Sequence, residues 1–176
     1  MVFERDFTCK QECIGCVDSD YAGDLDKRRS TTEYVFTLSQ ALVSWCSILQ
    51  STITFSTTKG EYMAMTTEGE YMAMTKAIKE AIWLQGLLDD LGIEQDMLKI
   101  NCNIMSAFYL IKNQVYHAKT KHIDVRFYFV REIFDEGDIE LLKIHTKENP
   151  ADMLTKVVTG VKFIYCKELL HILPVA

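Results

Sequence analysis

The strongest constraint on the fold is a change in hydrophobic period after the first third of the chain. Residues 14–21, 32–39 and 41–49 alternate apolar and polar side chains and are rich in β-branched and aromatic residues. This pattern is typical of strands in an antiparallel meander. From Thr67 to Gly92, apolar residues recur every three or four positions, as Met74, Ile78, Ala81, Leu84, Leu88 and Leu91. The second pattern predicts a long amphipathic helix that ends at a glycine in the C′ position.

The remaining segments predict a mixture of strands and helices. We expect a strand, two helices and a strand, in that order, at 98–104, 106–113, 123–134 and 138–146. Asn149 as N-cap and Pro150 at the first helical position predict a last helix. The order βββαβααβα indicates an α/β (α+β) fold around one mixed sheet. Within it, Trp45 and Trp83 are expected in the core.

Length and charge limit the classes of function. A chain of 176 residues fits one domain, and its net charge of -6 argues against a free-standing nucleic-acid binder. Nucleic-acid contact would therefore be local, at the basic segments 27–29 and 117–126, although solvated surface charge explains either segment equally well. No apolar run approaches the roughly 20 residues of a membrane span, and the N-terminus lacks a signal-peptide pattern. We expect a cytoplasmic protein with no membrane partner.

The six cysteines predict free thiols rather than a metal centre. Cys13 and Cys16 have the spacing of a zinc or redox pair, but no second pair follows at the distance that a zinc finger needs. Free cysteines buried as small hydrophobic side chains in a reducing compartment fit the pattern better.

Three acidic positions stand where predicted elements begin or end. Asp18 lies in the first strand, Glu61 or Glu70 at the start of the long helix, and Asp152 at the start of the last helix. Carboxylates brought together in this way repel one another, which should raise at least one pKa, unless a divalent cation is shared between them. Ligand sets made only of oxygen select magnesium or manganese, and two such ions can activate water for phosphodiester hydrolysis.

Each of these acids also has a purely structural interpretation. Thr67 to Glu70 matches a capping box, which needs no catalytic role for the glutamate. Asp152 would stabilise a helix N-terminus, and Asp18 beside Asp20 would suit a turn after a strand.

A tandem duplication makes the choice of glutamate a geometric question. TTKGEYMAM at 57–65 is followed by TTEGEYMAM at 66–74. Nine residues are roughly 2.5 helical turns, so a continuous helix would point Glu61 and Glu70 to opposite faces. Glu70 keeps its spacing to the apolar stripe that anchors the helix, whereas Glu61 keeps only its spacing to the preceding strand. We therefore expect Glu70 at the site and the first copy as a loop or added helical turns.

Five segments in order resemble one family. They are VDSDYAGDLDKRRSTTEYVFTLS, VSWCSILQST, STTKGEYMA, TKHIDVRFYFVREI and NPADMLTKVVTGVKF, and they run from residue 17 to 163. Together they resemble the ribonuclease H domain of copia-type retrotransposon Pol polyproteins. The resemblance spans residues 13–176, which leaves 1–12 as an N-terminal remnant or linker. It implies a ribonuclease H-like fold, a five-stranded mixed sheet flanked by helices.

The resemblance also implies a chemistry, a set of ligands and partners. The family holds two Mg²⁺ ions, or Mn²⁺, on an Asp-Glu-Asp-Asp quartet and cleaves the RNA strand of RNA–DNA hybrids. Carried over by motif, the catalytic positions are Asp18, Glu70 (or Glu61), Asn103 and Asp152, of which all but Asn103 would bind metal. The implied partners are the hybrid and the reverse-transcriptase domain of the parent polyprotein, in a cytoplasmic virus-like particle for the intact element.

This sequence departs from the family pattern at several positions. Asn103 replaces the third aspartate, Ile104 and Met105 replace the small polar pair after it, and Glu33 stands where the family usually has glycine. The candidates for contact with the nucleic acid are a serine and four basic residues: Ser106, Lys119, Lys121, His122 and Arg126. His145 is either a proton-transfer or product-release group or an ordinary surface histidine at a strand end.

Three hypotheses about function follow. The chain is a working hybrid endonuclease slowed by Asn103, an inactive relic that folds and binds nucleic acid weakly, or an unrelated interaction module with a similar fold. The first two differ in the consequence of Asn103, because a neutral amide lacks a charge worth roughly 4 kcal/mol at about 4 Å and an effective dielectric near 20.

Overall fold

The computed structural model describes residues 2–3, 11–20, 26, 29–53, 59–103 and 124–173, without the side chains of 2–3, 51–53, 59–68, 124–128, 155 and 173. The elements in chain order are β1 (Val2–Phe3), β2 (Cys13–Ser19), β3 (Arg29–Leu38), β4 (Ala41–Ile53), α1 (Lys59–Asp90), β5 (Leu98–Cys102), α3 (Asp124–Glu136), β6 (Ile139–Lys143), α4 (Asp152–Thr155), α5 (Gly160–Leu169) and β7 (Ile172–Leu173). The helix predicted at 106–113 lies outside the described residues.

The central sheet has five strands in the order β4-β3-β2-β5-β6. The first three form an antiparallel meander, while β5 pairs parallel with β2 and β6 parallel with β5. The turn between β3 and β4 places Ser39 and Gln40 at positive φ, as a two-residue hairpin turn requires. This arrangement confirms the predicted five-stranded mixed sheet.

A second sheet was not predicted from the sequence. β1 pairs antiparallel with β7, with Val2 opposite Leu173 and Phe3 opposite Ile172. Two residues from the segment expected to be a linker therefore pair with the last strand. The boundary proposed after residue 12 stays a prediction.

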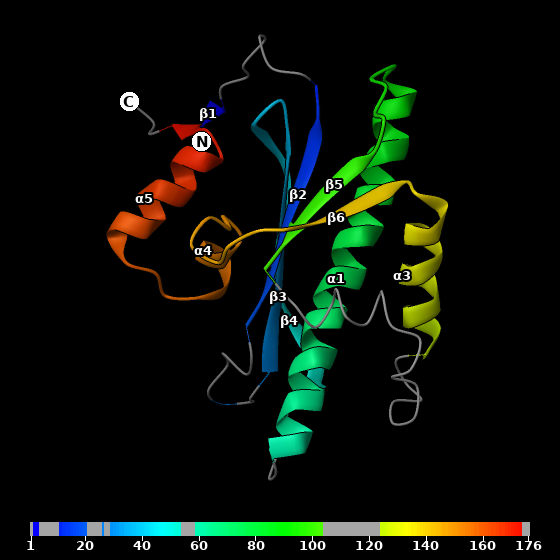
Figure 1. Ribbon diagram of the computed structural model, residues 1–176. Coiled ribbons are helices and arrows are strands. Elements are labelled where there is room, and N and C mark those ends of the chain that lie inside the picture. Colours follow the sequence, from blue (N-terminus) through cyan, green and yellow to red (C-terminus); the bar gives the residue numbers. More distant parts are fainter. Residues whose placement is uncertain are drawn as a thin grey trace.

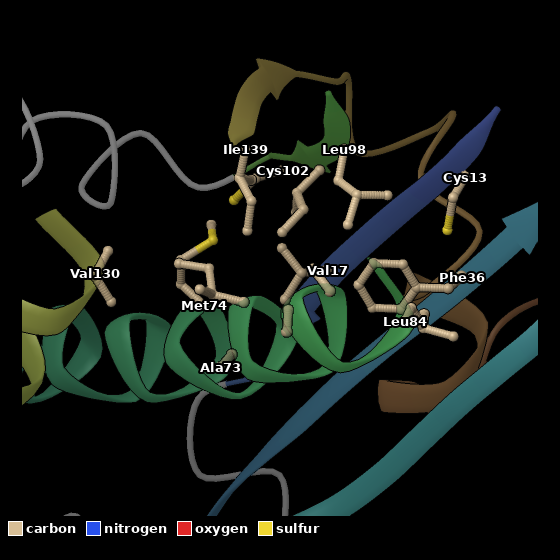
Figure 2. Close-up of a cluster of buried hydrophobic side chains, with 14 of the residues drawn as sticks. Cys13, Val17, Phe36, Ala73, Met74, Leu84, Leu98, Cys102, Val130 and Ile139 are labelled. Atoms are coloured by element: carbon tan, nitrogen blue, oxygen red, sulfur yellow. The ribbon is translucent and has the colours of Figure 1, made fainter. Parts of the chain in front are cut away.

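Helices cover both faces of the central sheet (Figure 1). α1 and α3 lie against one face, and α4 and α5 lie on the other. Alternation along β2 explains this arrangement, because Val17 belongs to the core cluster shared with α1, whereas Cys16 packs with Val35, Ala151 and Leu170. Figure 2 shows the larger cluster, in which Val17, Phe36, Met74 and Leu84 meet between α1 and the strands.

The long helix begins earlier than its apolar stripe predicts, at Lys59, and runs through both copies of the duplication. The side chains of α1 are described from Gly69, within the second copy, and there Tyr71, Ala73 and Met74 are buried. The repeat therefore adds helical turns to α1. Of the predicted stripe, every residue except Leu91 is buried.

Leu91 was wrongly placed in the core, since 64% of its surface is exposed. The helix ends at Asp90, and Gly92 takes the predicted positive φ of 70°. The reversal lets the Ile93 N–H donate to the carbonyl of Leu88 at 2.8 Å, and Ile93 packs against the core in place of Leu91.

The two tryptophans were also wrongly assigned to the core. Trp45 is 54% exposed and Trp83 is 60% exposed. Trp45 lies on β4, one of the two edge strands of the central sheet, and Trp83 lies outside the set of α1 residues that face the strands. An apolar side chain in a periodic segment was not enough to predict burial at these two positions.

The cysteines agree with the prediction of free thiols. Cys13, Cys16, Cys102 and Cys166 are buried and unbridged, and burial raises the pKa of both Cys13 and Cys16 to about 12. Cys13 and Cys16 belong to different core clusters on the two faces of the sheet. They cannot share a metal ion as they stand.

A search of the described helices for a stretch that is long and apolar enough to cross a bilayer finds none.

The duplication gives a matched pair of variants. Met74→Ala should lower the free energy of unfolding by about 2–4 kcal/mol, because this side chain is fully buried. Met65→Ala, at the same position of the first copy, should cost less than about 1 kcal/mol if the second copy carries the packing. Urea unfolding followed by circular dichroism measures both. Equal losses, or a large loss on deleting residues 57–65, would show that the first copy is structural.

Candidate metal and active site

The site is built where neighbouring elements end beside one another. Asp18 is buried near the end of β2, and Val17 pairs with Cys102, the last residue of β5. The next residues along these parallel strands are Asp18 and Asn103, which places them at neighbouring strand ends. Asp20 has a different role, because its Oδ1 accepts the Thr31 N–H at 2.5 Å and closes the connection between β2 and β3.

Asn149 fixes the start of α4 against the same strand. Its amide donates to the carbonyl of Val17 at 2.9 Å, and its Oδ1 accepts the Ala151 N–H at 3.1 Å. The helix starts at Asp152, two residues later than the predicted start at Pro150. It ends at Thr155, and a further helix that was not predicted, α5, follows from Gly160. The N-cap residue of α4 is Ala151 rather than the predicted Asn149, and buried Asn149 instead holds the start of the helix, with Asp152, beside β2.

One lysine joins the two aspartates. The Lys156 ammonium donates to Asp18 Oδ2 at 3.2 Å and to Asp152 Oδ1 at 2.6 Å. Lys162, from α5, donates to the other oxygen of Asp152. Two carboxylates that are 134 residues apart in sequence thus contact the same nitrogen, as the predicted convergence requires.

The two aspartates have opposite pKa shifts. Burial raises the pKa of Asp18, and Lys156 only partly offsets this effect. Repulsion from Asp152 contributes least, so the expected rise occurs but its main cause is burial rather than mutual repulsion. Burial also tends to raise the pKa of Asp152, but hydrogen bonds from Lys156 and Lys162 outweigh this effect, so the pKa is lowered.

Glu70 is positioned by a polar contact between α1 and the sheet. The Gln50 side-chain amide donates to the carbonyl of Gly69 at 2.8 Å and to Thr32 Oγ1 at 2.9 Å. A Cβ at Gly69 would lie 3.4 Å from Ser30 Oγ, which is ordinary van der Waals contact, so the helix lies directly against the sheet here. Burial and then the charge of Asp18 raise the pKa of Glu70 to about 7. Glu61 lies near the start of α1, but its side chain is outside the described set.

Asn103 holds the position predicted for the third carboxylate. Its Nδ2 donates to Thr146 Oγ1 at 3.4 Å, while its Oδ1 is buried and has no hydrogen-bond partner among the described residues. A buried acceptor without a donor is unfavourable, and it is the kind of atom that a cation or water satisfies.

Glu33 lies beside the predicted site residues, although in the sequence it stands out only as a departure from the family pattern. It lies on β3 directly opposite Asp18 and is completely buried. Burial is the main reason that its pKa rises to about 8, although a hydrogen bond from Ser47 to its Oε1 acts in the other direction. The available signal was a glutamate in the middle of the otherwise uncharged strand segment TTEYVFTL.

The oxygen atoms of the site are of the kind that binds a hard cation, although two lysine ammonium groups contact several of them. In the described part of the chain, no three His, Cys, Asp or Glu side chains are arranged to hold a metal ion. Lys156 and Lys162 contact both oxygens of Asp152 and one of Asp18. An ammonium shared by two carboxylates shows that the site attracts positive charge, and the remaining donors are oxygens of the type that magnesium prefers. The chemistry of these donors therefore fits a hard divalent cation, while in this structure Lys156 and Lys162 contact the carboxylates.

Most of the predicted nucleic-acid contacts lie outside the described residues. This holds for Ser106, Lys119, Lys121 and His122, while Arg126 lies in α3 without a described side chain. His145 is exposed after the end of β6, and its Nδ1 accepts the Lys147 N–H at 3.1 Å.

Comparison with solved structures identifies the class of fold. LC11-RNase H1, isolated from compost by a metagenomic approach, superposes with a TM-score of 0.57 at 16% identity, over 82% of this chain and 92% of that one. Its complex with an RNA/DNA hybrid gives a TM-score of 0.54 at 18% identity, over 81% and 93% of the two chains. The chain has a ribonuclease H fold.

Sequence comparison then gives the family. The retrovirus-related Pol polyprotein from transposon TNT 1-94 of Nicotiana tabacum is 49% identical over 155 residues, which cover 88% of this chain and 11% of that polyprotein. No protein-family model matches the chain. The chain belongs to the retrovirus-related Pol polyproteins of transposons, and it spans about a tenth of the length of this relative.

Buried Glu33 predicts that stability falls as pH rises. Its pKa is about 8 in the folded chain against an ordinary value of 4.5. The stabilising effect of its protonation is therefore complete below about pH 4.5 and is lost as pH rises through about 8. Relative to Glu33→Gln, the wild type should lose on the order of 2 kcal/mol of unfolding free energy between about pH 5.5 and pH 7.5.

Urea unfolding in chelator at several pH values measures this difference. Glu140→Gln is the matched control, because Glu140 is an exposed glutamate on β6 and its replacement should leave the pH dependence unchanged. Parallel stability curves for the wild type and Glu33→Gln would mean that Glu33 is ionised in the folded protein at all of these pH values.

Proposed function

We propose that this chain is the ribonuclease H domain of a copia-type Pol polyprotein and that it hydrolyses the RNA strand of RNA–DNA hybrids with Mg²⁺, at a reduced rate. The observation that carries the proposal is the convergence of Asp18 and Asp152 on one ammonium, with the charge of Asp18 acting on Glu70. A site for capping or turn formation would not need to bring these three elements together.

Each acidic residue has a distinct part in the proposed reaction. Asp18 is central, because its carboxylate is buried between the strand end and α4, and Asp152 adds a second carboxylate from α4. Glu70, held by the contact of Gly69 with Gln50, adds the third. Bound divalent cations would supply an activated water and stabilise the leaving oxygen. Lys156 keeps the two aspartates together until it withdraws.

The substrate and partners follow from the family and the fold neighbour. LC11-RNase H1 is known in complex with an RNA/DNA hybrid, and we propose a hybrid as the substrate of this chain. We also propose a reverse-transcriptase domain of the parent polyprotein as its partner and the cytoplasm as its location. Phosphate contacts would come from Lys119, Lys121, His122 and Arg126, with Ser106 near the minor groove.

Asn103 is the observation that favours the second candidate, an inactive relic. The amide contributes no charge, and its buried Oδ1 is unsatisfied in the described structure. Against this, Asp18, Glu70 and Asp152 are all present and positioned by their neighbours. We therefore expect weak activity rather than none, at least about a hundredfold below that of a relative with all four carboxylates.

Restoring the missing carboxylate should raise the rate. We expect Asn103→Asp to increase single-turnover cleavage of a labelled hybrid by at least about tenfold in Mg²⁺, because a ligand charge is regained. Asn101→Asp, which adds the same charge two residues earlier on β5, is the matched control and should give no gain. Asp18→Asn should abolish cleavage.

Two outcomes would contradict these expectations. A wild-type rate within a few-fold of Asn103→Asp would show that the amide does not limit the site. If neither protein cleaves the hybrid in Mg²⁺ or in Mn²⁺, while both remain folded, the chain is a relic and the proposed hydrolysis is wrong.

A further inference from the structure

A row of polar side chains crosses the sheet at the site. Asp18 on β2 pairs with Glu33 on β3, and Glu33 pairs with Ser47 on β4. Directly paired residues of antiparallel strands project from the same face. Asn103, at the end of β5, follows the pair Val17–Cys102 on the other side of β2. Asp18 therefore has Asn103 on one side and Glu33 on the other.

Only one oxygen of Glu33 is satisfied. Its Oε1 accepts a hydrogen bond from Ser47 Oγ at 2.8 Å, whereas its Oε2 has no hydrogen-bond partner in the described part of the chain. The residue is 0% exposed, so water does not compensate for the missing donor at the surface. The charged groups that act on it are Asp18, Asp20 and Lys156. A glutamate that only filled space would leave this atom at an unfavourable position.

The number of carboxylates in the predicted ligand set suggests a role for Glu33 Oε2. With asparagine at 103, the predicted ligand set has three carboxylates, those of Asp18, Glu70 and Asp152. Glu33 adds a fourth from the opposite side of Asp18. We propose that Glu33 is a further metal-ligating residue of this chain, whose Oε2 shares a divalent cation with Asp18 and supplies the charge that Asn103 lacks.

Contacts of two neighbouring residues, Ser47 and Lys156, are compatible with Glu33 as a metal ligand. Ser47 holds Oε1 and also lies 3.4 Å from the carbonyl oxygen of Leu154 in α4, which limits the movement of the glutamate. Lys156 has to leave Asp18 for a cation to enter, and its side chain is 44% exposed, so a path to solvent is open. Ser47 is thus a positioning residue, and Glu33 and Asp18 are the ligands. The inference rests on the proposed metal-dependent function.

Cation binding can be measured without any cleavage. Titrations of the purified chain with Mn²⁺, followed by electron paramagnetic resonance of the free ion, give the affinity of each variant. We expect Glu33→Gln to weaken Mn²⁺ binding by at least about tenfold, because the amide keeps the shape and the Ser47 contact but loses the charge. Glu140→Gln, at an exposed position of β6, should bind like the wild type. Unfolding in chelator checks that each variant is folded.

A compensating variant separates a ligand from a structural residue. If Glu33 supplies the charge that Asn103 lacks, adding Asn103→Asp to Glu33→Gln should restore Mn²⁺ affinity to within a few-fold of the wild type. A glutamate that matters only for packing would not be rescued by a charge at position 103, just after β5.

The outcomes also distinguish this inference from the function on which it rests. If Asp18→Asn abolishes Mn²⁺ binding but Glu33→Gln does not weaken it, the metal site stands and the role of Glu33 is wrong. If the wild type binds no Mn²⁺ at millimolar concentration, both the metal site and the role of Glu33 are wrong.

Discussion

The contact of α1 with the centre of the sheet determines the position of nearly everything else in this chain. Val17 of β2 meets Met74 and Ile78 of α1 in a core that excludes water from all three side chains. Burying several large apolar side chains contributes on the order of 1.5–3 kcal/mol each. The same contact sets the level of the helix along the strands, and Gln50 fixes that level through the carbonyl of Gly69. Glu70 comes one residue later, beside the end of β2.

The site is the place where this fold concentrates negative charge. Asp18, Glu33 and Asp152 are buried on or against neighbouring strands, and the structure balances them with the ammonium groups of Lys156 and Lys162. Removing charge from water costs several kcal/mol per ion unless it is paired. The two lysines contact Asp152 and Asp18 but not Glu33. The pKa of Asp152 falls because its hydrogen bonds outweigh burial, whereas burial raises the pKa of both Asp18 and Glu33. A divalent cation would offer both groups a better partner than one lysine can.

The duplicated segment shows which features of α1 the local apolar pattern could predict and which it could not. The apolar stripe from Met74 to Leu88 indicated which copy would pack, because an amphipathic face requires the sheet beside it. It did not show that α1 would start at Lys59, because the stripe begins only at Met74 and the first copy contains Gly60, a poor helix former. Leu91 had apolar character and the expected spacing, and the two tryptophans had apolar character, yet all three are exposed where the helix ends or where no described element covers them.

The sequence by itself determined the alternation of the strands, the stripe of the long helix, the free cysteines and the acidic positions at the ends of elements. These are local properties, set by side-chain period and by the conformations that residues such as Gly92 allow. Only the tertiary structure decided that Glu33 lies opposite Asp18, that Asn149 binds the carbonyl of Val17, and that Lys156 joins Asp18 to Asp152. Strand register and the docking of α4 bring together residues up to 138 positions apart. A pattern of near neighbours carries no information about such pairs.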